Sequence, residues 1–131
     1  MVGPVRPFEA EPLLVERYLR YQPEAERFLE FGDFRFFRME PAQARIIGGF
    51  ARAGWLDGER IGVSPRLTFA EERAALDELR AHAGVTLLGM DSLGLDLAVG
   101  TERRRLGFGD TPLAAAAATM RAQRLLDEPA A

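Results

Sequence analysis

The sequence contains no cysteine, no lysine, one histidine and one tryptophan among its 131 residues. The lack of cysteine excludes a disulfide framework and thiolate chemistry. No apolar run approaches the roughly 20 residues that a membrane-spanning helix needs. Pro4, Pro7 and Pro12 interrupt the stretch where a secretion signal would place a continuous apolar segment. We therefore expect a cytoplasmic protein that makes no membrane contact.

Several functional motifs are also missing. There is no Walker sequence, no GxSxG and no GxGxxG, and Gly107-Phe108-Gly109 lacks the third glycine of a dinucleotide motif. The acidic residues form no metal-ligand spacing or catalytic pair, so we predict no metal site and assign no catalytic residue. The net charge of −3 does not favour nucleic acid. All 17 basic residues are arginine, which we attribute to coding bias rather than to selection for guanidinium chemistry.

The second half of the chain has the clearest pattern. Thr68 and Glu71 have the spacing of a capping box, which predicts a helix after Thr68. Leucine and valine alternate with other residues from Leu93 to Val99, as in a strand with one buried face. The sequence predicts an α-β-β-β-α unit over residues 65–131, with these strands and final helix: Val85–Met90, Leu93–Val99, Arg103–Phe108 and Leu113–Leu126.

The first half, residues 1–64, is rich in phenylalanine. A helix is expected from Pro12, and period-2 alternation predicts a strand over Phe34–Phe37. Because Pro41 cannot continue a central strand, the chain should turn there and return as a strand over Ala44–Phe50. We expect a half-buried aromatic hairpin, in which replacing a fully buried Phe36 or Phe37 with alanine would cost about 3–5 kcal/mol. The predicted class is therefore α+β.

Short motifs along the chain extend this interpretation. In the first half they are Arg17-Tyr18-Leu19, Phe31-Gly32-Asp33-Phe34, Gly48-Gly49-Phe50 and Arg52-Ala53-Gly54-Trp55-Leu56, and in the second half Leu88–Leu97 and Arg105–Phe108. With these motifs the first half resembles the pyridoxamine-phosphate-oxidase-like, FMN-binding split barrels, and within them the haem-utilisation branch. A weaker resemblance continues into the α+β domain that follows the barrel in those proteins.

The resemblance implies a partial split β-barrel related to FMN- or haem-binding oxidoreductases, with an anionic cofactor at a homodimer interface. Arg52 would hold the phosphate or propionate group, since a guanidinium can bind such groups through two hydrogen bonds. Gly48 and Gly49 would allow close approach of the ligand. Trp55 would stack on the ring system, or else pack in the core or the dimer interface.

The departures from the family leave alternatives open. The family's first barrel strands precede anything in this sequence, and its His-Met-Asn-x-Asp-His run is absent. His82 is compatible with a haem ligand but fits better a histidine that complements the end of its own helix. The chain is thus a cofactor-binding protein, a cofactor-free interaction or regulatory module that has lost the first barrel half, or a small-ligand binder without redox chemistry.

Overall fold

The computed structural model describes residues 1–48, 52–57 and 66–128. The chain forms two compact units, one from Met1–Ala10 and Phe28–Ser64, the other from Glu11–Arg27 and Pro65–Ala131. A division at residue 64 alone would assign residues 11–27 to the first unit, whereas this segment packs in the second. The described residues contain helices and small antiparallel sheets, which confirms the α+β class. None of their helices has the length and apolar character to cross a membrane.

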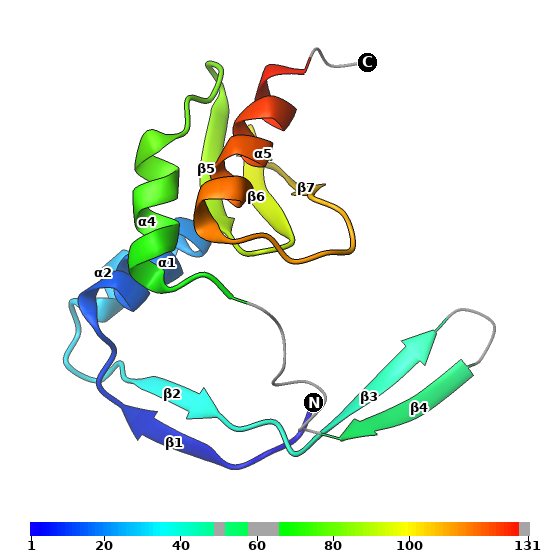
Figure 1. The fold of residues 1–131 in the computed structure, drawn as a ribbon. Coiled ribbons are helices and arrows are strands. Elements are labelled where there is room, and N and C mark those ends of the chain that lie inside the picture. The colour runs from blue at the N-terminus through cyan, green and yellow to red at the C-terminus, as the bar shows by residue number, and fades with distance from the viewer. Residues whose placement is uncertain (49–51, 58–65, 129–131) are drawn as a thin grey trace. The chain divides into compact units, whose positions relative to one another are not determined.

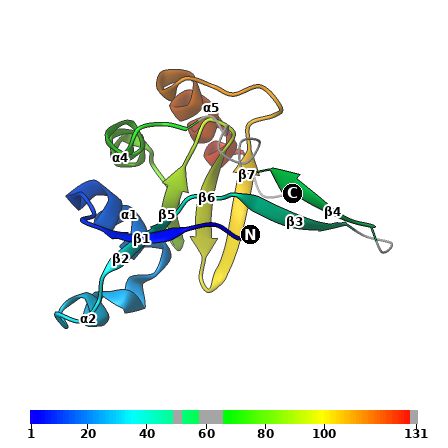
Figure 2. The same cartoon turned by 90° about the horizontal axis from the view of Figure 1, so that it is seen from below.

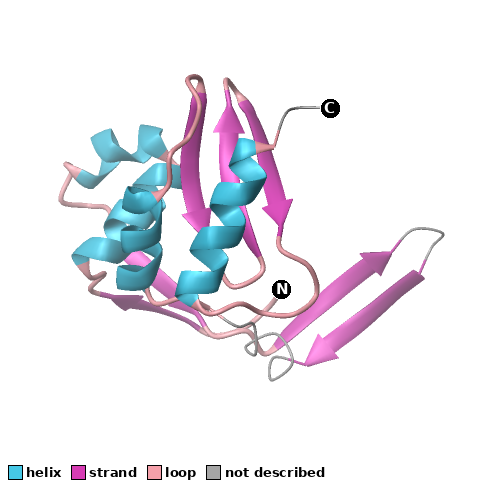
Figure 3. Cartoon of the chain, turned by 45° about the horizontal axis from the view of Figure 1, so that its top comes forward, coloured by secondary structure: helices cyan, strands magenta, loops and turns pink. Residues whose placement is uncertain are grey.

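The second unit is a three-stranded antiparallel sheet in the order β5-β6-β7, with helices α4 and α5 packed against it (Figures 1 and 3). The element order confirms the predicted α-β-β-β-α arrangement. Helix α1 adds to this unit by contacting β5 and α4. The elements of the second unit are α1 (Pro12–Tyr21), the 3₁₀-helix η1 (Pro23–Ala25), α4 (Phe69–Glu78), β5 (Val85–Met90), β6 (Gly94–Val99), β7 (Glu102–Gly107) and α5 (Ala115–Asp127).

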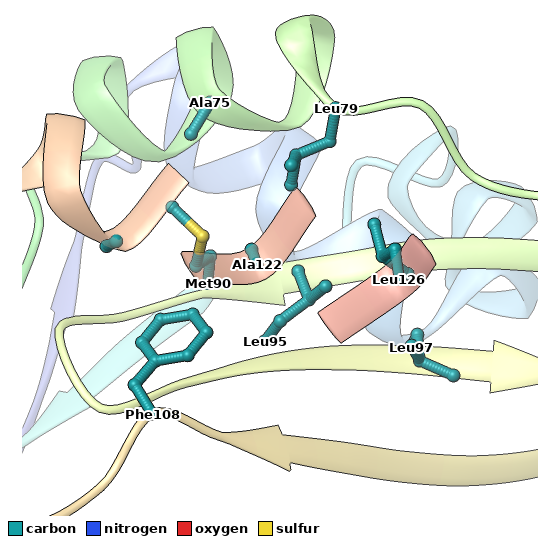
Figure 4. Close-up of a cluster of buried hydrophobic side chains, with 9 residues drawn as sticks. Ala75, Leu79, Met90, Leu95, Leu97, Phe108, Ala122 and Leu126 are labelled. Carbon is teal, nitrogen blue, oxygen red and sulfur yellow. The ribbon is translucent and has the colours of Figure 1, made fainter. Parts of the chain in front are cut away.

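The hydrophobic core of the second unit lies between the sheet and its two long helices (Figure 4). Leu95, on the central strand, is fully buried. Ala118 and Ala122 of α5 are also fully buried, because their small side chains let the helix backbone lie close to the sheet. The predicted alternation on β6 is confirmed at Leu95 and Leu97, which face this core, but Val99 at the end of the strand is 41% exposed.

Local helix signals are confirmed at α4 and are wrong by a few residues elsewhere. The capping box forms as predicted, with Thr68 and Glu71 each accepting a hydrogen bond of 3.0 Å from the other's backbone N–H. Helix α5 begins at Ala115 rather than Leu113. Ala114, the residue before the helix, has an extended backbone (φ −68°, ψ 162°), and the Leu113 N–H donates to the carbonyl of Ser92 (2.9 Å).

The first unit contains two separate two-stranded antiparallel sheets (Figure 3). The predicted aromatic hairpin is wrong in its pairing. The strand over Phe36–Met39 pairs with residues 5–8, and the strand over Gln43–Gly48 pairs with residues 52–57. The described residues of this unit contain no closed barrel. Its strands are β1 (Val5–Phe8), β2 (Phe36–Met39), β3 (Gln43–Gly48) and β4 (Arg52–Asp57), and the short helix α2 (Glu26–Leu29) lies where the two units divide.

The pairing error has a backbone cause. Pro41 interrupts the strand, as expected from its missing N–H, but the chain does not fold back into a hairpin there. Val2 instead exchanges hydrogen bonds with Gln43 (2.8 and 3.2 Å), and Glu40 donates to the Pro4 carbonyl (3.0 Å). The N-terminal segment therefore follows β2 and the start of β3 as their partner. A sequence pattern shows that a strand exists, but not which distant strand it pairs with.

Candidate functional site

The hairpin of β3 and β4 carries the residues that the sequence predicts for cofactor binding. Gly48 and Arg52 are register partners at one end of the hairpin, and Trp55 is the partner of Arg45 further along. Gly49 lies outside the described residues. The backbone thus brings Gly48 and Arg52 together, while Trp55 lies three residues away from Arg52 on the same strand.

The three-residue separation places the predicted residues on different faces. Successive residues of a strand belong to opposite sides of its sheet, so position 52 is on the face opposite to Trp55. The side chain of Trp55 is 62% exposed, and Ile47 on the same face is 77% exposed. A flat ligand lying on one face of the hairpin would therefore contact Gly48 and position 52, or Trp55, but not all three.

A second group of functional side chains, which the sequence interpretation missed, surrounds Glu72 of α4. This carboxylate is only 3% exposed. Arg17 Nε donates to both of its oxygens at 3.1 Å, and Arg20 Nη2 donates to Oε1 at 2.8 Å. The backbone N–H of Met90 donates to Oε2 at 2.9 Å. The two arginines come from α1, so Glu72 joins α1, α4 and β5.

Tyr21 extends this polar contact across the sheet, where α1 lies next to β5 (Figure 2). Its hydroxyl donates to Asp96 Oδ2 at 2.7 Å. A Cβ at Gly89 of β5 would overlap the Tyr21 hydroxyl, so a side chain at this position would require the Tyr21 ring to move. An isolated glycine inside a predicted strand indicates such a close approach or a bulge, and β5 also has a bulge between Leu87 and Gly89. Gly89 is therefore the residue from which the sequence could have indicated this close contact.

A cavity of about 330 Å³ lies beside Tyr21 and Asp96, next to three arginines of β7. Arg105 donates to Asp96 (2.9 Å) and to both oxygens of Asp91 (2.8 Å). Arg104 pairs with Glu102, and Arg103 donates to the Tyr21 carbonyl. Each guanidinium already has an oxygen partner within the chain. Of the three, Arg103 links β7 to α1, whereas Arg104 and Arg105 pair with acidic residues of the sheet and of the β5–β6 turn.

The surroundings of Tyr21 change its acidity. Burial, followed by the hydrogen bond to Asp96 and the negative charge of Asp96, raises the pKa of Tyr21 far above its ordinary value of 10.0. The phenol therefore stays neutral and remains a hydrogen-bond donor even at a pH where an ordinary tyrosine ionises. Its hydrogen bond contributes stability that is fully present below about pH 10 and is lost as pH rises through the folded-state pKa.

We predict that Tyr21 ionises well above pH 10 in the folded protein. The sequence has one other tyrosine, Tyr18, so phenolate absorbance followed to high pH reports both phenols. The Tyr21→Phe variant supplies the Tyr18 baseline, and the difference between the two titrations isolates Tyr21. Ionisation of Tyr21 near pH 10 in the folded protein would contradict both its burial and its hydrogen bond to Asp96.

His82 does not take the role expected for it. Helix α4 ends at Glu78, so His82 does not lie at the end of its own helix. Its Nε2 is 3.0 Å from the carbonyl oxygen of Leu126, in the last turn of α5. The histidine thus contacts the carbonyl end of a different helix. The described residues contain no cluster of three or more histidine or acidic side chains able to hold a metal ion.

Comparison with known proteins gives distant likenesses among the solved structures. No family model matches the chain, and no curated protein matches it. A solved structure of a haem-binding protein from Mycobacterium smegmatis is 24% identical and aligns with a TM-score of 0.41. The alignment covers 93% of this chain and 62% of that protein, so the chain spans less than two thirds of its length. A TM-score of this size does not establish a common fold.

Proposed function

We propose that the chain is a split-barrel-related protein that pairs with a second copy through its first unit and holds an anionic cofactor, FMN or haem, at the β3–β4 hairpin. The observation that supports assembly is the exposure of apolar side chains. Among the described residues, fourteen large hydrophobic residues are exposed; Tyr18, Val99 and Met120 belong to the second unit, and the other eleven belong to the first. None of the described residues of the first unit is buried.

Many of these exposed side chains belong to the two-stranded sheets of the first unit, and a sheet of that size has little stability on its own. A two-stranded sheet is at best marginally stable in water, and its open edges offer unpaired N–H and C=O groups to another chain. Contact with a second copy covers apolar surface and strand edges together. Most soluble oligomers are symmetric assemblies of one chain, so a homodimer is the arrangement we propose.

The cofactor proposal rests on the family resemblance and on the register of the hairpin. Gly48 faces Arg52 across the two strands, which places an open backbone next to an arginine. Gly54 and Ile46 are register partners on the same face; a Cβ added at Gly54 would meet no atom within 4 Å, and Ile46 is exposed. This face is therefore open to a flat ligand with a phosphate or carboxylate group. Trp55 belongs to the opposite face and is not part of this site.

We expect saturable binding of FMN or haemin by the purified protein, measured by absorbance or fluorescence titration. The Arg52→Ala change should weaken binding by one charge-assisted contact, about 1.5–3 kcal/mol, or roughly 10-fold to 150-fold in dissociation constant. Arg35→Ala, which removes one exposed arginine elsewhere in the first unit, is the matched control and should leave the affinity unchanged.

The second candidate function is a cofactor-free interaction module, and the division of Arg52 and Trp55 between two faces favours it. An aromatic ring on the face opposite to the ligand is more suited to a protein contact. No saturable binding of FMN or haemin at tens of micromolar, together with a stable dimer, would select this function. Redox catalysis requires a bound cofactor and is therefore tested by the same titration.

A further inference from the structure

One face of the β3–β4 hairpin combines exposed apolar and charged side chains. By register and alternation it carries Gln43, Arg45 and Ile47 from β3 and Trp55 and Asp57 from β4; we name it the Trp55 face. All five residues are exposed. Its large apolar side chains are the tryptophan and an isoleucine, the most exposed large hydrophobic residue described.

The two charges of this face are opposite in sign and have no ion-pair partner among the described residues. Arg45 is directly opposite Trp55, and Asp57 is two residues further along β4. The charged pair therefore occupies diagonal positions about 7–8 Å apart. One positive and one negative charge give a face with no net charge, which does not favour a strongly charged partner such as a nucleic acid.

A face of this kind is complementary to its own copy. A two-fold axis that exchanges the positions of Arg45 and Asp57 makes two opposite-charge pairs at once, since each contact occurs twice in such an interface. Trp55 neighbours both charged positions, so the same axis passes beside it and brings the two tryptophans together. The two tryptophans then form an apolar centre at the axis, and the two charge pairs lie beside it.

We propose that the Trp55 face is the contact between two copies of this chain, with Arg45 of each protomer paired with Asp57 of the partner subunit. This inference rests on the dimer of the proposed function and assigns its surface. It leaves the opposite face, with Gly48 and position 52, for the ligand. The area of one hairpin face is small compared with the roughly 800 Å² per partner of a standard interface. We therefore expect a dimer whose population depends on protein concentration.

Charge reversal tests the pairing. Arg45→Asp places four negative charges at the contact and Asp57→Arg places four positive charges there. Each single variant should raise the dimer dissociation constant by about tenfold or more in sedimentation measurements. An equimolar mixture of the two variants should form heterodimers, because each opposite-charge pair is then restored between chains. Arg35→Asp, a charge reversal elsewhere in the first unit, is the control and should leave dimerisation unchanged.

The mixture separates the proposal from its rivals. A pair between Arg45 and Asp57 within one chain would be restored by the double variant Arg45→Asp/Asp57→Arg but not by mixing the single variants. Native mass spectrometry identifies the heterodimer directly, and circular dichroism of each variant checks that the second unit is folded. Single variants that dimerise like the wild type would overturn the Trp55 face while leaving the dimer of the proposed function intact. A wild-type protein that is monomeric at every concentration would overturn both.

Discussion

Replacing Glu72 with alanine is expected to lower the free energy of unfolding by about 3–5 kcal/mol, the cost of breaking a buried ion pair by removing one partner. The carboxylate accepts hydrogen bonds from two arginines and one backbone N–H. Its removal leaves Arg20, which is 22% exposed on its side chain, with less compensation for its charge. The N–H of Met90 also loses its acceptor, and Met90 is itself a core residue.

The measurement is urea denaturation followed by circular dichroism, with Asp77→Ala as the matched control. Asp77 is on the same helix and pairs with Arg73 at 3.4 Å, but both side chains are exposed. An exposed pair of this kind contributes less than about 1 kcal/mol. Equal losses from the two substitutions would show that Glu72 is not buried in solution.

The Glu72 contact also explains why residues 11–27 belong to the second unit. Helix α1 has no buried residue of its own, so its apolar stripe is not what anchors it most firmly. Its anchoring contacts are instead Arg17 and Arg20 on Glu72, and Tyr21 on Asp96. We infer that polar contacts decide the position of this helix, although periodicity alone favours the apolar stripe that includes Leu14 and Tyr18.

The second unit could be predicted well because its decisive signals are local. A capping box at Thr68, alternation through Leu95 and Leu97, and small residues at Ala118 and Ala122 each fix an element or a buried face from neighbouring residues. The exact helix ends could not be predicted. Helix α5, for example, begins at Ala115 after an extended Ala114, although the sequence predicts a start at Leu113.

The first unit and the candidate site depend on contacts that are distant in sequence. The partner of β2 is a strand some thirty residues earlier, as the register of Phe8 with Phe36 shows, and no pattern in β2 identifies it. Positions 52 and 55 are three residues apart, so in a strand they belong to opposite faces of the sheet. This conclusion requires the knowledge that residues 52–57 form a strand. The burial of Glu72 was equally hidden, because an acidic residue in a helix is usually solvated.

The Leu95→Ala change is expected to destabilise the protein by about 3–5 kcal/mol, because it removes buried methyl groups and leaves a cavity in a closely packed core. Leu95 is 0% exposed and packs between the sheet and α5. The matched comparison is Phe37→Ala. Sequence reasoning allowed for a similar cost there, but Phe37 is 58% exposed and Phe36 is only partly buried.

For Phe37→Ala we expect a change of no more than about 0.5 kcal/mol, as for a surface substitution away from special contacts. Both variants should be compared by urea denaturation at low protein concentration, so that association through the first unit contributes little. If the first unit assembles through the Trp55 face, raising the protein concentration should stabilise the wild type and the Phe37→Ala variant alike, because Phe37 lies on β2 and outside that face. The cost of Leu95→Ala should change little with concentration, because its cavity lies within one chain. A larger loss from Phe37→Ala than from Leu95→Ala at low concentration would place the main core in the first unit and contradict the structure.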